Sequence, residues 1–318
     1  MKILLTGGAG FIGSHLSEAL LGEGHELILV DNFNDYYPPE IKERNLSAII
    51  DHPRLELVRG DIRDRDLVEK LHSRGRFGAV IHLAARAGVR PSLENPVLYQ
   101  EVNVEGTLNL LEAARRRPPG RFIFASSSSV YGSNPRQPWK ESDSDLRPES
   151  PYGATKVIGE HLCRIYQRTY NLKMAVMRLF TVYGPRQRPD MAIHKFTRLI
   201  SRGRRIPVFG DGTSRRDYTY VADIVSGFLG ALRRDFEFEI FNLGGGHSIT
   251  LNGLIAKLEE HLGRKADFEK LPVQAGDAAS TWADVSKGRK LLGYRPRFTL
   301  EEGLEKFIAW FKAEGDNE

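Results

Sequence analysis

Residues 7–13 read Gly7-Gly8-Ala9-Gly10-Phe11-Ile12-Gly13, and the segments on either side decide what this stretch means. The apolar run 2–6 before it predicts a buried strand. A helix is expected from the last glycine to about residue 23, and a second strand over 26–30. This order is typical of a dinucleotide-binding turn. Gly7 permits the tight turn, Gly10 lets the backbone approach a pyrophosphate at the helix N-terminus, and Gly13 allows close packing of helix on strand.

Asp31 ends the second strand, 18 residues after Gly13. A carboxylate at this place accepts hydrogen bonds from an adenosine ribose and repels a 2′-phosphate. The next residues, Asn32-Phe33, provide no arginine that would offset the repulsion. The sequence therefore predicts NAD, and not NADP, as the cofactor.

Strands and helices continue to alternate through the first 180 residues. Further strands are expected at 55–58, 79–83, 121–125 and 174–178, and helices at 64–73, 95–117 and 152–170. Such alternation predicts an α/β fold, a Rossmann-type doubly wound parallel sheet with its ligand crevice at the carboxyl ends of the strands. Asp61 and Ile62 follow the third strand, where a loop covers the adenine. Ala84 and Ala85 end the fourth strand, where small residues let a ribose lie against the backbone.

The pattern changes after residue 178, where a loop rich in prolines, glycines and cations spans 184–189 and shorter elements follow. One more strand of the sheet is expected at 240–243. We therefore expect residues 1–180 to form an NAD-binding domain to which 217–245 return. Residues 181–216 and 246–318 then form a smaller α/β substrate domain.

A second cluster of polar residues follows the strand that ends at residue 125. Tyr152 and Lys156 are four residues apart, so they share one face of the predicted helix 152–170. A tyrosine has a reference pKa near ~10, and a lysine ammonium one turn away lowers it. Ser127 can hold the same proton path. These three residues fit the removal of a proton from a substrate alcohol while a hydride leaves the same carbon. A Tyr and a Lys four residues apart are common in proteins, and it is the glycine turn that supports the catalytic interpretation here.

Composition excludes several classes of function. The single cysteine, Cys163, excludes an intrachain disulfide, and neither C-x-x-C nor a histidine cluster suggests a metal site. GxSxG is absent, which argues against a serine hydrolase. The formal charge is +5, but no basic stripe is interleaved with aromatic residues, and no apolar run approaches the ~20 residues that cross a bilayer. We therefore expect a cytoplasmic protein without a metal, nucleic-acid or membrane partner.

Several motifs together carry a resemblance that covers nearly the whole chain: GGAGFIG, GDIRD at 60–64, HLAA at 82–85, SSSSVYG, YGATK, and RRDYTYVADI from 215. The chain resembles the extended short-chain dehydrogenase/reductase superfamily of nucleotide-sugar epimerases and dehydratases. The stretches 31–37, 87–96 and 177–192 are most similar to UDP-glucuronate 4-epimerases. The resemblance implies an isomerase that oxidises C4 of a UDP-sugar transiently through a 4-keto intermediate, with NAD recycled. It also implies a homodimer formed through the helices at 95–117 and 152–170.

The resemblance assigns catalysis to Ser127, Tyr152 and Lys156. Together with the glycine turn it gives these candidate cofactor contacts: Gly7, Gly10, Phe11, Ile12, Gly13, Asp31, Asn32, Asp61, Ile62, Leu83, Ala84, Ala85, Asn103, Tyr152 and Lys156. The candidate substrate contacts are Arg90, Ser128, Ser129, Thr181, Arg188, Phe209, Arg216, Gln274 and Asp277. Of these, Phe209 is expected to stack on uracil, Arg216 to bind the diphosphate, and Gln274 and Asp277 to face the nucleotide. Three hydroxyls and Arg188 are expected to hold a uronate carboxylate.

Other activities of the superfamily remain alternatives. Dehydratases carry Asp-Glu after the active Ser or Thr, whereas this chain has Ser128 and Ser129, and UDP-glucuronate decarboxylases usually have an acidic residue there. UDP-glucose/UDP-galactose 4-epimerases have Asn at Thr181 and Arg at Gln274. The choice between a uronate and a neutral hexose stays open. A non-catalytic NAD-binding or RNA-binding protein is the alternative of another class, since fold does not fix function.

Overall fold

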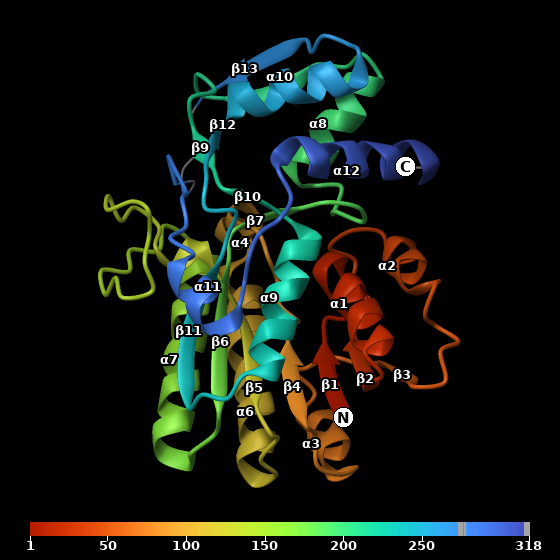
Figure 1. The fold of residues 1–318 in the computed structure, drawn as a ribbon, viewed down its shortest axis with the longest axis vertical. Helices are drawn as coiled ribbons and strands as arrows, with labels where there is room; N and C mark the ends of the chain where they lie inside the picture. The colour runs from red at the N-terminus through yellow and green to blue at the C-terminus, as the bar shows by residue number, and fades with distance from the viewer. Residues whose placement is uncertain (273–275, 277, 315–318) are drawn as a thin grey trace.

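The computed structural model describes residues 1–272, 276 and 278–314 (Figure 1). Its centre is a parallel sheet with the strand order β11-β6-β5-β4-β1-β2-β3. The strands are β1 Lys2–Thr6, β2 Glu26–Asp31, β3 Leu55–Arg59, β4 Ala79–His82, β5 Phe122–Ser127, β6 Met174–Leu179 and β11 Phe238–Leu243. The order reverses between β1 and β4, which is where doubly wound sheets bind dinucleotides. The predicted Rossmann-type fold is confirmed, and the strand expected at 240–243 is the edge strand β11.

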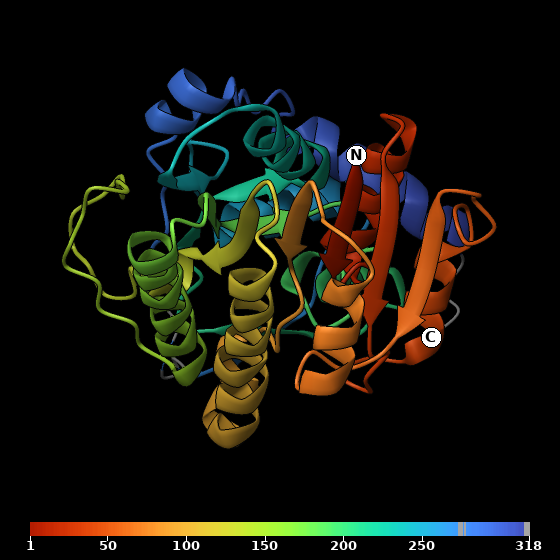
Figure 2. The ribbon, with the colours of Figure 1, turned by 90° about the horizontal axis from the view of Figure 1, so that it is seen from below.

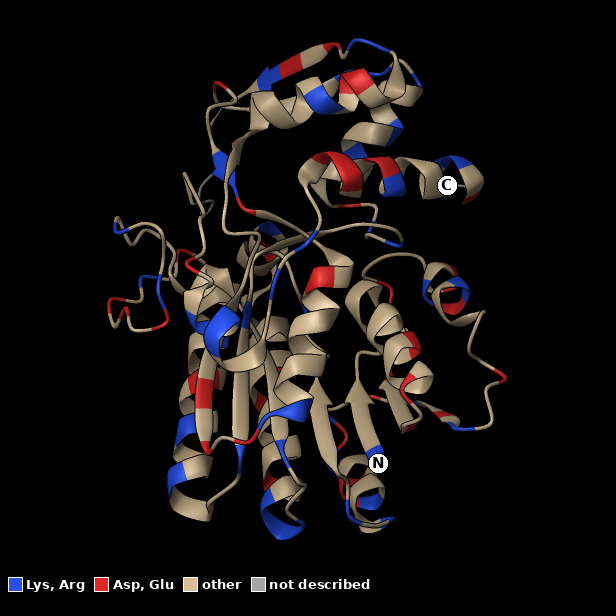
Figure 3. Ribbon diagram, viewed as in Figure 1, with Lys and Arg blue, Asp and Glu red and all other residues tan. Residues whose placement is uncertain are grey.

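Helices cover both faces of the sheet, which explains why its strands are apolar at nearly every position. Ile3 and Leu5 pack in the same core as Leu16 of α1, whereas Leu4 packs with Leu111 of α6 in a second core on the opposite face. Figure 2 shows the layers edge-on. One face carries α1 Phe11–Gly22 and α9 Val221–Arg233; the other carries α3 Arg65–Ser73, α6 Gly106–Arg116 and α7 Pro151–Tyr170. Charged residues of both signs lie mainly on helices and loops (Figure 3).

The helix expected at 95–117 is divided into three parts. After α4 (Val89–Glu94), α5 spans Pro96–Gln100, a π-helical turn spans Glu101–Glu105, and α6 follows. Periodicity of the apolar residues predicted a single helix because it does not reveal a local change from α to π hydrogen bonding. The π turn matters for the site because it carries Asn103.

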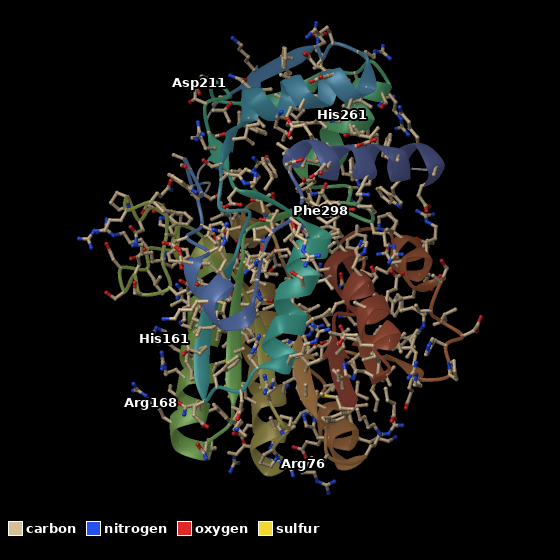
Figure 4. All side chains as sticks on the ribbon, in the orientation of Figure 1. Arg76, His161, Arg168, Asp211, His261 and Phe298 are labelled. Atoms are coloured by element: carbon tan, nitrogen blue, oxygen red, sulfur yellow. The ribbon has the colours of Figure 1, made fainter. Side chains whose placement is uncertain are left out.

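The shorter elements gather at the carboxyl ends of the central strands, in the upper part of Figure 1. They form three two-stranded sheets: β7 Thr181–Tyr183 with β10 Tyr218–Tyr220, β8 Ile206–Phe209 with β13 Phe268–Leu271, and β9 Arg215–Arg216 with β12 Ile249–Thr250. The helices there are α8 Ala192–Ser201, α10 Leu251–Leu262 and α12 Leu300–Glu314, while α11 Ser286–Leu292 lies beside β11. Figure 4 labels Asp211 and His261 in this upper part, and His161 and Arg168 on α7. A remaining helix, α2 Pro39–Leu46, follows β2.

A search of the described residues for a membrane-crossing helix finds none that is long and apolar enough. The cytoplasmic location expected from the sequence stays a prediction.

Candidate active site

A cleft with a volume of about 390 Å³ opens where the strand order of the sheet reverses. Its wall contains the residues at or just beyond the carboxyl ends of five central strands: Gly7, Asp31, Leu83, Ser127 and Leu179. The fold therefore brings together segments that are far apart in the chain, as expected for a doubly wound sheet.

The glycine turn at the cleft cannot accommodate larger residues at two places. Gly7 has φ of 73°, and a Cβ atom there would lie 2.6 Å from the backbone nitrogen of Ala84. A Cβ atom on Gly13 would lie 2.2 Å from the carbonyl oxygen of Gly7. Both contacts are with backbone atoms, which cannot rotate away, so the turn and α1 hold their positions only with glycine at these sites.

The N-terminus of α1 faces the cleft through Gly10, Phe11 and Ile12. Gly10 gives the helix no side-chain cap, and the first turn contains no acidic residue. The first N–H groups of a helix have no partner within the helix, and its dipole favours an anion there. This end of α1 therefore fits the pyrophosphate of NAD.

Asp31 is buried at the end of β2, and each of its carboxylate oxygens accepts one backbone N–H. Oδ2 accepts from Ala9 at 3.1 Å and Oδ1 from Phe33 at 2.9 Å. The ammonium of Lys42, from α2, lies 3.9 Å from Oδ1, and burial lowers the pKa of that lysine. Asp31 thus ties the glycine turn to the following loop, and its environment contains a cation that the sequence did not suggest.

The three predicted catalytic residues come from β5 and from the first turns of α7. Ser150 caps this helix by accepting from the Gly153 N–H at 3.1 Å, which directs Tyr152 into the cleft. Ser127 lies beside Tyr152 in the cleft wall, and its hydroxyl donates to the Ser129 hydroxyl at 3.1 Å. The Lys156 ammonium is buried and donates to the carbonyl of Ala125 at 2.8 Å, with its Nζ 6.0 Å from the centre of the Tyr152 ring.

The electrostatics of Tyr152 differ from the expectation. Burial raises the pKa of Tyr152, and this outweighs the lowering by the neighbouring Ser127 side chain and by the positive charge of Arg188. The sequence predicted that Lys156 would lower this pKa, but Arg188 is the cation that acts on it. Burial also lowers the pKa of Lys156 to about 8, against an upward effect of Glu160.

Four of the candidate substrate residues also line the cleft: Ser128, Ser129, Thr181 and Arg188. The guanidinium of Arg188 donates to both carboxylate oxygens of Asp190, at 2.9 Å each. It also lies 5.1 Å from the ring centre of Tyr36. In this arrangement Arg188 is held inside its own loop by Asp190.

The remaining candidate substrate residues lie elsewhere. Arg90 and Phe209 contact each other, with the guanidinium carbon 4.5 Å from the ring centre, but neither is part of the cleft wall. Arg216 is on β9 and also stands outside the wall. Gln274 and Asp277 lie outside the described residues.

The candidate cofactor contacts other than Asn103 line the cleft: Gly7, Gly10, Phe11, Ile12, Gly13, Asp31, Asn32, Asp61, Ile62, Leu83, Ala84, Ala85, Tyr152 and Lys156. Asn103 lies behind the wall. Its amide accepts from the Arg86 N–H at 2.8 Å, and donates to the Arg86 carbonyl and to the Thr155 hydroxyl at 3.0 Å each. It therefore joins the loop after β4 to α7. The individual roles of all these residues stay predictions.

The cleft-wall residues that sequence reasoning missed include two tyrosines and two cations: Tyr36, Tyr37, Lys42 and Arg86. Two aromatic residues directly before Pro38-Pro39 were a signal that the loop after Asp31 packs against the rest of the protein. No comparable signal marked Lys42 or Arg86. Among the described residues, no group of three or more His, Cys, Asp or Glu side chains has the arrangement of a metal site.

Known proteins resemble the chain over almost all of its length. The pattern of the NAD dependent epimerase/dehydratase family matches residues 3–244. The UDP-glucuronate 4-epimerase of Thermodesulfobacterium geofontis is 43% identical over 311 residues, which cover 97% of this chain and 95% of that protein. Similar crystal structures include UDP-glucuronic acid 4-epimerase from Bacillus cereus with UDP-glucuronic acid and NAD, at a TM-score of 0.92 and 38% identity, covering 99% of this chain and 100% of that one. UDP-glucose 4-epimerase from Thermotoga maritima with UDP-glucose gives 0.91 and 35%, covering 99% of both chains.

Proposed function

The chain belongs to the NAD dependent epimerase/dehydratase family, and from this premise we propose that it is an NAD-dependent 4-epimerase of UDP-sugars, with UDP-glucuronate as its substrate and UDP-galacturonate as its product. The observation that carries the proposal is the composition of the cleft. It combines the uncapped N-terminus of α1, which fits NAD, with Ser127, Tyr152 and Lys156 and with a third group of three hydroxyls and one arginine.

The proposed reaction begins with removal of the proton on the sugar O4. Tyr152, as its phenolate, is the base, and the hydroxyl of Ser127 beside it can stabilise that anion. Bound NAD would supply the chemistry of reversible hydride uptake from C4. Lys156, one turn from Tyr152, places a positive charge near the phenolate before it accepts the proton. Once the 4-keto sugar has turned its other face toward the cofactor and C4 has regained a hydride, Tyr152 returns the proton to O4, so no net oxidation occurs.

The proposed choice of a uronate rests on Arg188 and on three hydroxyls in the same cleft wall. The 4-keto form of a uronate is a β-keto acid, which loses CO₂ when its carboxylate aligns with the ketone. Hydroxyls of Ser128, Ser129 and Thr181 can hold that carboxylate away from this alignment, and Arg188 can add a charge-assisted bond, roughly twice as strong as a neutral one. The positions after Ser127 carry no acid that would promote loss of water or CO₂.

The pairing of Arg188 with Asp190 favours a second candidate, the epimerisation of a neutral UDP-hexose. A guanidinium that already donates to Asp190 has fewer N–H donors left for a substrate carboxylate. In addition, a solved UDP-glucose 4-epimerase is similar over 99% of this chain. The deciding experiment compares kcat/KM for UDP-glucuronate, UDP-glucose and UDP-galactose with one preparation. We expect UDP-glucuronate to be preferred. An equal or higher value for a neutral hexose replaces the uronate proposal with the second candidate.

We also propose the two-domain division expected from the sequence. Support for the return of 217–245 comes from β11, which pairs with β6, and from α9, which packs on α1. The UDP-sugar is then bound between the sheet and residues 181–216 and 246–318.

A homodimer is proposed through α6 and α7. Exposed apolar side chains on this side of the molecule include Val97, Leu108, Ile158 and Ile165, and Val97 and Ile165 are 65% and 53% exposed. Burying such residues against a second copy removes apolar surface from water. Sedimentation of the wild type is expected to give a dimer, and Ile165→Glu a monomer. A monomeric wild type contradicts the proposal.

A further inference from the structure

A buried ion pair lies directly behind the catalytic residues, and the proposed reaction does not use it. Arg178 of β6 donates to both carboxylate oxygens of Glu160 on α7, from Nε at 2.9 Å and from Nη2 at 2.7 Å. The Ser126 hydroxyl donates to the same carboxylate at 2.5 Å. All three side chains are buried. Burying two charges costs free energy unless geometry and hydrogen bonds compensate, so such a pair needs an explanation.

The location of the pair links it to catalysis. Glu160 is one helical turn beyond Lys156, on the same face of α7. Ser126 is paired in register with Arg178, and it precedes Ser127 on β5. The hydrogen bonds of Glu160 therefore fix α7 against β5 and β6 at the level from which Lys156 extends into the cleft.

The titratable groups on the elements around Lys156 belong to α7, β4 and β6. On α7 these groups are Tyr152, Glu160 and Cys163, and burial raises the pKa of the Cys163 thiol, which stays neutral. His82, from β4, has its pKa lowered to about 3, so this imidazole is neutral too. Arg178, from β6, is a cation. Glu160 thus provides the permanent negative charge among these groups.

We propose that Glu160 is a positioning residue for Lys156: its carboxylate, held by Ser126 and Arg178, supplies the counter-charge that keeps the buried Lys156 ammonium protonated in its place one turn from Tyr152. The proposal rests on the proposed role of Lys156 in epimerisation. Arg178 orients the carboxylate through its two hydrogen bonds from β6. Its own charge is shared between Glu160 and the face of the Tyr131 ring, 4.7 Å from the guanidinium carbon.

The expected consequence is a change in titration. The pKa of Lys156 is already lowered to about 8 by burial, and Glu160 is the first of the groups that raise it. In Glu160→Gln the pKa of Lys156 is expected to fall by about one unit or more, which is the size of effect that a close opposite charge has. Lys156 then loses its proton within the working range of the enzyme, and the alkaline limb of the pH profile of kcat moves to lower pH by a similar amount.

The test measures Lys156 directly, so that it does not depend on turnover. Proteins with ¹⁵N-labelled lysine are titrated by NMR, and Lys156→Met identifies the Nζ signal of Lys156. The variants are Glu160→Gln, Glu160→Asp and, as a matched control, Asp223→Asn. Asp223 is a buried carboxylate on α9 that accepts from the backbone N–H groups of Arg297 and Phe298. Its loss is expected to lower stability without moving the Lys156 titration.

The outcomes separate a role in charge from a merely structural role. We expect a lowered Lys156 pKa in Glu160→Gln, a value within about half a unit of wild type in Glu160→Asp, and no change in Asp223→Asn. A folded Glu160→Gln with the wild-type titration overturns the proposal. If that variant does not fold, Glu160→Asp decides, because a full-unit shift with the charge retained also overturns it. A wild type that titrates as expected but turns over no UDP-sugar refutes the proposed function alone.

Discussion

Replacing Asp31 with asparagine tests how the cleft selects its cofactor. Each carboxylate oxygen of Asp31 accepts one backbone N–H, from Ala9 at 3.1 Å and from Phe33 at 2.9 Å. Asparagine keeps one acceptor oxygen and turns its NH₂ group toward the other N–H. The donor left unpaired lowers the stability of the free and the NAD-bound protein alike. The affinity for NAD changes because the adenosine ribose loses a hydrogen bond to a charged acceptor, which contributes about 1.5–3 kcal/mol. We therefore expect Asp31→Asn to bind NAD roughly ten- to 150-fold more weakly.

The same substitution is expected to reduce the preference for NAD over NADP. A phosphate about 5 Å from the Asp31 carboxylate is repelled by about 3 kcal/mol per unit charge at an effective dielectric constant of ~20. Lys42, 3.9 Å from Asp31, returns part of that energy by attracting the phosphate. Because a 2′-phosphate carries a charge of about −1.5 to −2, a net penalty of about 3 kcal/mol remains, which gives a preference of about a hundredfold in the wild type. In Asp31→Asn the ratio should fall to within about tenfold.

Calorimetric titration of nucleotide-free protein with NAD and with NADP measures both effects. Asp35→Asn is the matched control, since this carboxylate lies in the same loop but its side chain is 94% exposed. Screening by water leaves such a group little influence on either affinity. Wild-type dissociation constants for NAD and NADP that agree within about threefold, or an unchanged ratio in Asp31→Asn, refute the reasoning.

Four further substitutions have defined outcomes. Tyr152→Phe should keep its fold and NAD but lose about 10²–10⁴-fold in turnover, and a rate above about a tenth of wild type contradicts its role as base. Gly13→Ala places a Cβ atom 2.2 Å from a carbonyl oxygen and should lower stability by at least about 1–3 kcal/mol in thermal melts, whereas Gly22→Ala, with open space around it, should not. Lys156→Met should raise the free energy of unfolding at pH 7 by about 3 kcal/mol, because the ammonium has a pKa of about 8 when folded and 10.5 when unfolded. This gain should fade between pH 8 and 10.5, where the unfolded wild-type chain holds more protons than the folded one, as chemical denaturation across that range will show. Arg188→Ala should lower turnover of UDP-glucuronate and release a 4-keto pentose, detectable by mass spectrometry; unchanged turnover without this product contradicts a role for Arg188 in holding the carboxylate.

The sequence predicted those parts of the site that depend on short spacings. A Cβ atom on Gly13 would meet backbone atoms of its own turn, and Tyr152 and Lys156 are separated by one helical turn. The alternation of apolar runs with helical periodicity predicted the sheet for the same reason. Because the sheet buries both of its faces, each strand is apolar at nearly every position and can be recognised from the sequence.

Other parts of the site depend on contacts between distant segments, which no local pattern encodes. Lys42 reaches Asp31 only because α2 folds back over the glycine turn. Arg90 meets Phe209 across two separate parts of the fold. The direction of the pKa shift of Tyr152 likewise depends on how deeply the fold buries it, which spacing along α7 does not determine.

The late return of the chain to its central sheet also bears on biosynthesis. β6 ends at residue 179, but its outer neighbour, β11, begins at residue 238. At roughly 5–20 residues per second, a ribosome needs about 3–12 s to make the segment between them. For that time the apolar edge of β6 has no partner, and an unpaired edge is a template for pairing with other chains. Nascent chains stalled between residues 179 and 238 should therefore be the species that most requires chaperones, and release of residue 243 should end that requirement.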